Sequence, residues 1–263
     1  MTTTTVRPVA LKIGVVGKGG VGKTTTSGLI ARAYAERGRS VVAIDTDSNP
    51  NLGLSLGLTL EQTEAVPVLP RSAVVGAGGN ANAADLIADY GRSTPAGPTL
   101  LSAIKVAAAG AGCTCSGHAT VRSLLSDALE NVDLTLVDME AGLEHLSRSG
   151  GTLAYADVLL VIMEPSRKSI LTGARTVALA EELGIPRTFG VGNKARLPDD
   201  AEFFATVAAE YGVPLAGLVP QDPDVIEADR LGTPLPPGKG APVRAAVAEI
   251  AAFVDNELVG AGS

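Results

Sequence analysis

The stretch at residues 17–24, G-K-G-G-V-G-K-T, restricts the fold of this chain more than any other. Its spacing fits G-x-x-x-x-G-K-[ST], a loop whose backbone N–H groups cradle phosphates. The fixed positions of the motif are Gly17, Gly22, Lys23 and Thr24. An apolar run at residues 11–16 precedes the loop, and helical apolar spacing over residues 24–37 follows it, which is the strand-to-helix context the motif requires. Lys18 is one cation more than such a loop needs.

Apolar runs alternate with amphipathic stretches along the rest of the chain. Strands are predicted at residues 11–16, 40–44, 134–137, 158–163, 188–191 and 215–219. Helices are predicted at residues 24–37, 120–129, 170–183, 200–211 and 242–258. Continuously apolar strands imply a sheet that is covered on both faces, so we predict a three-layer α/β fold of the P-loop NTPase type with a mostly parallel, doubly wound sheet. Ligands of such sheets bind at the carboxyl ends of the strands.

Residues 71–112 interrupt this alternation, being rich in Ala, Gly, Pro and Asn. We interpret them as an insertion between the second and third core strands, with a short helix near residues 83–90 and a strand near residues 99–106. A tolerated surface excursion is the alternative. No second domain boundary is evident, so residues 1–263 are predicted to form a single domain.

Composition narrows the function classes. The chain is 46% hydrophobic but only 3% aromatic, so its core must be aliphatic, and its net charge of −7 disfavours nonspecific binding to nucleic acid or to an anionic membrane. The first twelve residues lack the pattern of a signal peptide, and no uncharged apolar run reaches about 18 residues, so we expect a cytoplasmic protein without membrane association.

The only cysteines, Cys113 and Cys115, are too close for an unstrained disulfide and in a reducing compartment favour metal binding or redox work.

The loop predicts the phosphate contacts of a nucleotide. Lys23 is expected to reach the β- and γ-phosphates, Thr24 to bind Mg²⁺, and Thr25 to reach the α-phosphate from the helix N-terminus. The remaining backbone contacts are expected at Gly17, Gly19, Gly20, Val21 and Gly22.

Acidic residues at strand ends supply the other parts of phosphoryl transfer, which needs a positioned water and a second hold on the metal. Asp45 and Asp47 follow the second strand, and we assign Asp47 to orient the attacking water; either could instead be a loop cap. Asp138 ends an apolar strand and suits a water-mediated Mg²⁺ contact. The backbone N–H of Gly142 is placed to approach the γ-phosphate, which would make residues 138–142 a hydrolysis-sensitive switch.

Asn193 ends the fifth predicted strand in G-N-K-A-R. Its amide offers both a donor and an acceptor to an adenine edge, although asparagine at a strand end is also a common turn former. Residues 220–223, P-Q-D-P, are a further candidate to close over the base.

With these motifs in place, the chain resembles the deviant Walker-A ATPases, the class that includes the MinD/ParA partitioning ATPases and the nitrogenase iron protein. The resemblance implies an ATP-dependent homodimer in which two ATP molecules lie between the subunits. It also implies that Lys18 crosses to the γ-phosphate bound by the other subunit, which gives the surplus cation an anion to meet.

Within that class the chain is most similar to the CooC-type nickel-insertion ATPases of carbon monoxide dehydrogenase maturation. The similarity rests on D-T-D-S-N-P-N-L at residues 45–52, G-C-T-C at 112–115 and V-D-M-E-A-G-L-E-H-L at 137–146. It covers about residues 12–235, with residues 76–110 poorly matched. It implies a carbon monoxide dehydrogenase-like client.

Cys113 and Cys115 can fill only half of a tetrahedral site for a soft or borderline metal, whereas two subunits would supply four sulfurs. We therefore predict a Ni²⁺ or Zn²⁺ site that is completed at the dimer interface. His118 could assist the metal or lie on a helix surface, and His145 suits packing or signal transmission better than ligation.

Three alternatives stay open. An iron–sulfur reductase or carrier similar to the nitrogenase iron protein would also bridge subunits with four cysteines, but that family spaces its cysteines far apart. A MinD-type membrane ATPase would carry a basic amphipathic C-terminal helix, whereas residues 242–258 hold one basic and three acidic residues. A ParA-type DNA-segregation ATPase would need basic surface patches.

Overall fold

An eight-stranded sheet runs through the computed structural model, which describes residues 10–70, 83–103, 121, 132–141 and 153–259. The strand order is β3-β4-β2-β5-β1-β6-β7-β8, and every neighbouring pair is parallel except β3 with β4. The strands are β1 (Leu11–Gly17), β2 (Val41–Asp45), β3 (Arg92–Ser93), β4 (Thr99–Ser102), β5 (Leu134–Asp138), β6 (Val158–Met163), β7 (Thr188–Ala195) and β8 (Leu215–Pro220). The α/β fold with a mostly parallel sheet is therefore confirmed.

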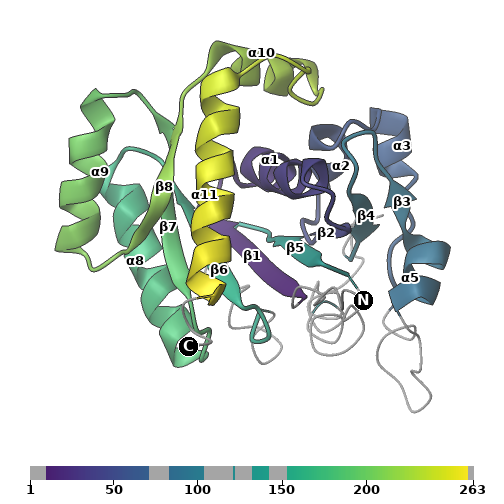
Figure 1. Ribbon diagram of the computed structural model, residues 1–263, viewed down its shortest axis with the longest axis horizontal. Coiled ribbons are helices and arrows are strands. Elements are labelled where there is room, and N and C mark those ends of the chain that lie inside the picture. The colour runs from purple at the N-terminus through teal and green to yellow at the C-terminus, as the bar shows by residue number, and fades with distance from the viewer. Residues whose placement is uncertain (1–9, 71–82, 104–120, 122–131, 142–152, 260–263) are drawn as a thin grey trace, which may run out of the picture.

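Helices cover both faces of the sheet (Figure 1). The described helices are α1 (Lys23–Glu36), α2 (Leu52–Ser55), α3 (Leu60–Glu64), α5 (Ala83–Tyr90), α8 (Arg167–Glu182), α9 (Asp199–Glu210), α10 (Pro223–Leu231) and α11 (Ala241–Val259). One hydrophobic cluster joins the sheet to α1, α2 and α11, and a second joins it to α5, α8 and α9. Among the described residues, no helix combines the length and the apolar character that spanning a bilayer requires.

The strand order places the end of β1 at a topological switch point. β1 lies between β5 and β6. The strands that follow it in the chain, β2, β4 and β5, lie on one side of β1, and the later strands β6, β7 and β8 lie on the other side. Such a reversal opens a crevice beyond the carboxyl ends of the central strands. The phosphate loop at residues 17–22 begins at this point.

Several elements differ from the sequence-based expectations. The segment around β4 is no surface excursion, because β4 pairs with β2 in parallel and buries Leu100 and Leu101 at 2% and 0% exposure. The helix predicted at residues 83–90 is confirmed as α5. The strand predicted at residues 188–191 continues to Ala195, so Asn193 lies within β7 rather than after it. The helix predicted at residues 120–129 falls, apart from one residue, outside the described residues.

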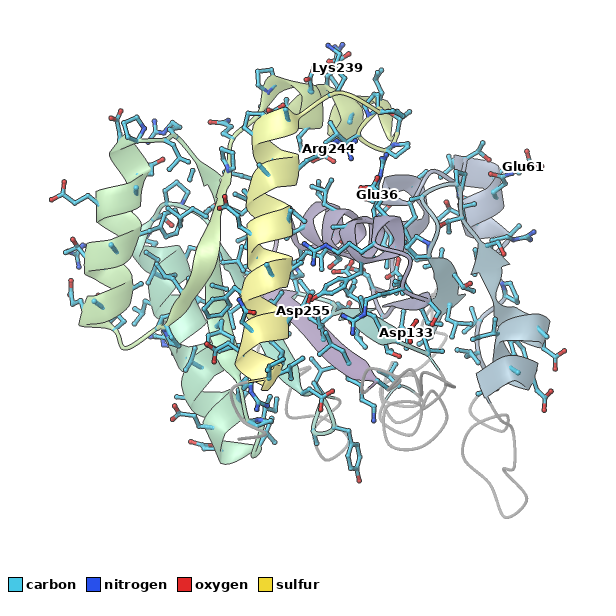
Figure 2. The ribbon with its side chains drawn as sticks, viewed as in Figure 1. Glu36, Glu61, Asp133, Lys239, Arg244 and Asp255 are labelled. Atoms are coloured by element: carbon cyan, nitrogen blue, oxygen red, sulfur yellow. The ribbon has the colours of Figure 1, made fainter. Side chains whose placement is uncertain are left out.

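The seam between α1 and α11 is fixed by a buried tyrosine. The Tyr34 side chain is fully buried, and its hydroxyl lies 3.1 Å from Ala251 O and 3.3 Å from Asp255 Oδ1. Asp255, on α11 (Figure 2), also receives hydrogen bonds from Arg37 and Arg39. The two guanidinium groups lie over the Tyr34 ring at 5.6 Å and 5.2 Å from its centroid.

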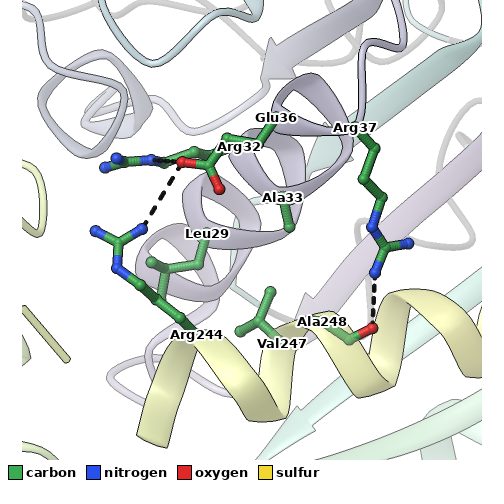
Figure 3. Close-up of a pocket in the computed structure, with 8 residues that line it drawn as sticks. All are labelled: Leu29, Arg32, Ala33, Glu36, Arg37, Arg244, Val247 and Ala248. Atoms are coloured by element: carbon green, nitrogen blue, oxygen red, sulfur yellow. Dashed lines mark hydrogen bonds and ion pairs between the residues drawn. The ribbon is translucent and has the colours of Figure 1, made fainter. Parts of the chain in front are cut away.

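Further along the same seam is a small groove of about 160 Å³ (Figure 3). Arg32 donates to Glu36 over 2.7 Å, and Arg244 of α11 lies 3.9 Å from the same carboxylate. Arg37 donates to the carbonyl of Ala248 over 2.9 Å. These guanidinium groups therefore pair with acceptors of the two helices and fasten α11 against α1.

Replacing Tyr34 with Phe should lower the free energy of unfolding by about 1 kcal/mol, because the buried carbonyl of Ala251 loses the hydroxyl that donates to it. Urea denaturation followed by circular dichroism measures this. Tyr90→Phe, a partly buried tyrosine on the opposite face, is the matched control and should change stability by less than about 0.5 kcal/mol. Equal effects of the two substitutions would contradict the role of the Tyr34 hydroxyl.

Candidate functional site: the phosphate loop and its carboxylates

The phosphate loop has a backbone shape that only glycine can supply at two positions. Gly22, which precedes α1, has φ +89°, and a Cβ placed there would lie 2.4 Å from Nδ2 of Asn193. Gly17 has φ +149°, and a Cβ there would lie 2.5 Å from the carbonyl oxygen of Ile162. The loop is therefore pressed between β6 and β7 as it enters α1, and its successive N–H groups form the kind of concavity that binds anions.

Two lysines of the loop have different surroundings. Lys23 is 8% exposed, and its Nζ donates to the carbonyl of Lys18 over 3.3 Å. Burial lowers the pKa of Lys23, while the carboxylates of Asp138, Asp47 and Glu140 act in the opposite direction. The Lys18 side chain is exposed at the mouth of the loop. Lys23 is thus fixed within the site and Lys18 faces outward.

Asp138 meets the first turns of α1 at the end of β5. The hydroxyl of Ser27 donates to Asp138 Oδ1 over 2.9 Å, and the Thr24 hydroxyl also hydrogen-bonds to this carboxylate. Asp138 is 1% exposed. A hydroxyl and a carboxylate in contact beside a phosphate loop are hard oxygen donors suited to Mg²⁺, so the residues present fit this ion. Ser27 was not predicted from the sequence, because its role appears only when α1 packs beside β5.

A second carboxylate lies next to Asp138. Asp45 is its registered neighbour across the β2–β5 pair, and it is 1% exposed. Burial, reinforced by the charge of Asp138, raises the pKa of Asp45 to about 7. Burial likewise raises the pKa of Asp138 to about 6, against the hydrogen bonds from Thr24 and Ser27. The pair thus carries less than its full negative charge near neutral pH.

Asp45 organises the loop that contains Asp47. Its Oδ1 accepts the backbone N–H of Asp47 over 3.0 Å, and its Oδ2 accepts that of Leu52 over 2.9 Å. Asp47 is half-buried and its Oδ1 accepts the N–H of Asn49 over 2.9 Å. Asp45 therefore shapes the turn, and Asp47 lies close enough to Lys23 to act on its pKa.

Asn193 and Lys194 hold the phosphate loop from β7. Asn193 Nδ2 donates to Val21 O over 2.8 Å, and Lys194 Nζ donates to Gly20 O over 2.6 Å. Side chains of successive strand residues normally point to opposite faces. Here the β7–β8 register is irregular between Gly192 and Ala195, and Lys194 has φ +57°, so both side chains reach the loop. The sequence drew attention to Asn193 but not to Lys194 as a contact of the loop.

Helix α10 meets α1 beside the loop. The Thr25 hydroxyl, expected to reach an α-phosphate, donates to Asp229 at 3.1 Å and 3.3 Å from its two carboxylate oxygens. Asp222 caps α10 by accepting the N–H groups of Asp224 and Val225. The P-Q-D-P stretch thus starts a helix that contacts the first turn of α1.

Five residues singled out in the sequence lie outside the described residues: Gly142, Cys113, Cys115, His118 and His145.

Residues 13–235 match the family described as CobQ/CobB/MinD/ParA nucleotide binding domain. The chain belongs to this family. The matched range spans the phosphate loop, both carboxylate-bearing strands, β7 and α10. As a CobQ/CobB/MinD/ParA protein, the chain is a nucleotide-binding ATPase.

One relative within the family is the carbon monoxide dehydrogenase accessory protein CooC of Rhodospirillum rubrum. It is 36% identical over 237 residues, covering 84% of this chain and 88% of that protein. Among solved structures, the cell division ATPase MinD of Pyrococcus furiosus superposes with a TM-score of 0.70 at 21% identity, covering 94% of this chain and 99% of that chain. MinD of Pyrococcus horikoshii, complexed with Mg-ADP, gives 0.69 at 21% identity, with coverages of 97% and 99%. These two structures share the fold.

The buried carboxylates predict a pH dependence of stability in the metal-free, nucleotide-free protein. The pKa of Asp45 rises from 3.8 to about 7 on folding, so between these values the folded state holds more protons than the unfolded state. This contribution to stability is complete below pH 4 and is lost as the pH rises through 7. Urea unfolding in EDTA from pH 5 to 8 should show wild type losing stability relative to Asp45→Asn. Parallel curves for the two proteins would contradict the assignment.

Proposed function

We propose that the chain is a Mg²⁺-dependent ATPase that dimerises on binding ATP and uses a Cys113/Cys115 metal site to assist nickel insertion into carbon monoxide dehydrogenase or a related metalloenzyme. The observation that carries the proposal is the 36% identity to a carbon monoxide dehydrogenase accessory protein over most of both chains. The two thiols of G-C-T-C, which are separated by one residue, supply the chemistry that such a task requires.

The nucleotide half of the proposal assigns the phosphates to the loop. Lys23 binds the β- and γ-phosphates, backbone groups of residues 17–22 surround them, and Thr24 with Asp138 holds Mg²⁺, the latter through water. The geometry supports this, because the Thr24 hydroxyl already hydrogen-bonds to Asp138. MinD of Pyrococcus horikoshii, which shares the fold, is complexed with Mg-ADP, and this supports the binding of a nucleotide together with Mg²⁺. When bound, Mg²⁺ neutralises charge that develops on the phosphate oxygens.

Hydrolysis is assigned to Asp47 and to a second subunit. Asp47 accepts a hydrogen bond from the attacking water and orients it, and its half-buried carboxylate near Lys23 suits that task. Lys18 reaches the γ-phosphate on the partner subunit, and its exposure at the loop mouth is what a contact across an interface needs. The N–H of Gly142 approaches the γ-phosphate of the nucleotide bound at residues 17–24.

The base and the α-phosphate are assigned to two further residues. The amide of Asn193 faces the adenine edge while its Nδ2 hydrogen bond to Val21 keeps it oriented. Thr25 binds the α-phosphate from the start of α1 and exchanges its hydrogen bond to Asp229 for one to the nucleotide.

The metal ion bound by the two cysteines is the cargo that the protein delivers to its client enzyme. Cys113 and Cys115 give two thiolates per subunit, and a dimer gives four, which completes a tetrahedral set for Ni²⁺ or Zn²⁺. Closing the dimer around ATP assembles this set, and opening it after hydrolysis halves the set and lowers the affinity for the metal. Release to the client is thereby coupled to turnover.

Lys18→Ala should impair ATP-dependent dimerisation and hydrolysis much more than nucleotide affinity, because Lys18 acts only once two subunits meet. Light scattering after size exclusion, with and without ATP, gives the mass, and titration with a fluorescent nucleotide gives the affinity. Lys239→Ala, an exposed lysine far along the chain, serves as the control and should dimerise as wild type does. A Lys18→Ala protein that dimerises normally would refute the contact between subunits.

Cys113→Ala and Cys115→Ala should each abolish stoichiometric metal binding and leave ATP binding intact. Metal analysis of the dimer after loading with Ni²⁺ or Zn²⁺ measures the stoichiometry, and we expect about one ion per wild-type dimer. Glu181→Ala, an exposed residue of α8, is the comparison variant and should keep its metal. Unchanged stoichiometry in the cysteine variants would exclude the proposed site, and a brown, iron-loaded dimer would favour the iron–sulfur alternative.

A further inference from the structure

Hydrogen bonds join the loops that follow β2 and β5, beside the phosphate loop. The Thr46 hydroxyl donates to the carbonyl of Asp138 over 2.9 Å, and the N–H of Glu140 donates to that hydroxyl over 3.3 Å. Two residues further on, the Ser48 hydroxyl donates to Oε1 of Glu140 over 2.8 Å. We name this set of contacts the inter-loop clasp; its members are Thr46, Ser48, Asp138 and Glu140.

The clasp continues the sheet beyond its last regular pair. β2 and β5 are parallel neighbours that end with Asp45 opposite Asp138, and the N–H of Thr46 adds one more ladder bond to Asp138 O at 3.1 Å. The Ser48–Glu140 hydrogen bond then connects the two loops past the end of this ladder. The loops are therefore held together by side chains where the backbone pairing stops.

Asp47 lies between the two anchoring residues of its loop. Thr46 on one side and Ser48 on the other both contact the segment after β5. Asp47 itself is bonded within its own loop, through its N–H to Asp45 and its Oδ1 to Asn49. The loop that carries Asp47 is thus held on both sides of this residue by contacts with the segment that ends β5 and follows it.

The other end of the clasp adjoins the phosphate loop. Ala141, next to Glu140, lies close to Gly19, since a Cβ on Gly19 would be 3.7 Å from that of Ala141. The carboxylates of Glu140 and Asp47 both act on the ammonium group of Lys23. A displacement of residues 139–141 would therefore move groups that contact the phosphate loop and, through Ser48, the loop that carries Asp47.

We propose that Glu140 is a positioning residue that holds Asp47 through Ser48 and so makes the orientation of the attacking water depend on the segment after β5. The proposal rests on the hydrolytic role given to Asp47 above. Glu140 acts through Ser48, so its loss should slow turnover without weakening the binding of ATP. A group that bound the nucleotide directly would change both.

Steady-state ATP hydrolysis by the full chain tests this. Ser48→Ala and Glu140→Ala should each lower kcat about tenfold while KM for ATP changes less than twofold, since a hydrogen bond to a charged group is lost away from the nucleotide. The double variant should be no slower than the slower single variant, because both changes remove the same Ser48–Glu140 hydrogen bond. Ser48→Thr, which keeps a hydroxyl, should restore at least half of the wild-type kcat.

Two exposed substitutions are the matched controls, Ser93→Ala on β3 and Glu181→Ala on α8, and both should hydrolyse ATP at the wild-type rate. The inference is overturned by an unchanged kcat in Glu140→Ala, by losses that multiply in the double variant, or by a KM that rises in proportion. Asp47→Ala distinguishes a failure of the proposed function from a failure of the role proposed for Glu140. If it abolishes turnover while Ser48→Ala does not slow it, the proposed function stands and the clasp has no role; if it hydrolyses ATP normally, the role of Asp47 fails and the inference fails with it.

Amide hydrogen exchange gives a readout that needs no activity. Exchange of residues 46–49 should accelerate in both Ser48→Ala and Glu140→Ala and stay unchanged in Ser93→Ala and Glu181→Ala. Acceleration in Ser48→Ala alone would show that Glu140 does not hold the loop, and would overturn the inference.

Discussion

The hydrogen bonds that Thr24 and Ser27 make to Asp138 are the contact on which the rest of the site depends. They tie the first turns of α1 to the end of β5, and α1 begins directly after the phosphate loop. A carboxylate that is 1% exposed is costly to bury, and these two donors with the nearby ammonium group of Lys23 offset that cost. The loop, the oxygens proposed to hold Mg²⁺ and the neighbouring Asp45 are all adjacent to this one junction.

The sequence was sufficient to predict the elements whose pattern lies within one short stretch of the chain. The six strands predicted from continuous apolar runs are all present, because buried parallel strands are continuously apolar, and the phosphate loop lies where the motif placed it. The strand predicted near residues 99–106 is present as β4 (Thr99–Ser102), but its parallel pairing with β2, which buries it in the sheet, had no signal in the sequence. Helices α2 and α3 are four and five residues long, too short for a periodic pattern.

Within the site, the sequence identified residues that belong to motifs and missed those that act through packing. Lys23, Thr24, Asp45, Asp47 and Asp138 converge at the ends of three neighbouring strands, as a parallel sheet requires. Ser27, Lys194 and the Ser48–Glu140 contact depend on distances between segments far apart in the chain. The bend of β7 at Lys194, with its positive φ at a residue other than glycine, has no pattern in the sequence that would reveal it.

That bend gives the nucleotide site a support outside its own motif. Because Asn193 and Lys194 hold two carbonyl groups of the phosphate loop, the loop acquires its shape when the sheet folds, before any nucleotide arrives. Less conformational entropy then has to be lost on binding. The curvature of β7 therefore influences the phosphate loop from outside its motif. Small changes in this curvature would alter the affinity of the loop for a triphosphate without a change in any residue of the loop.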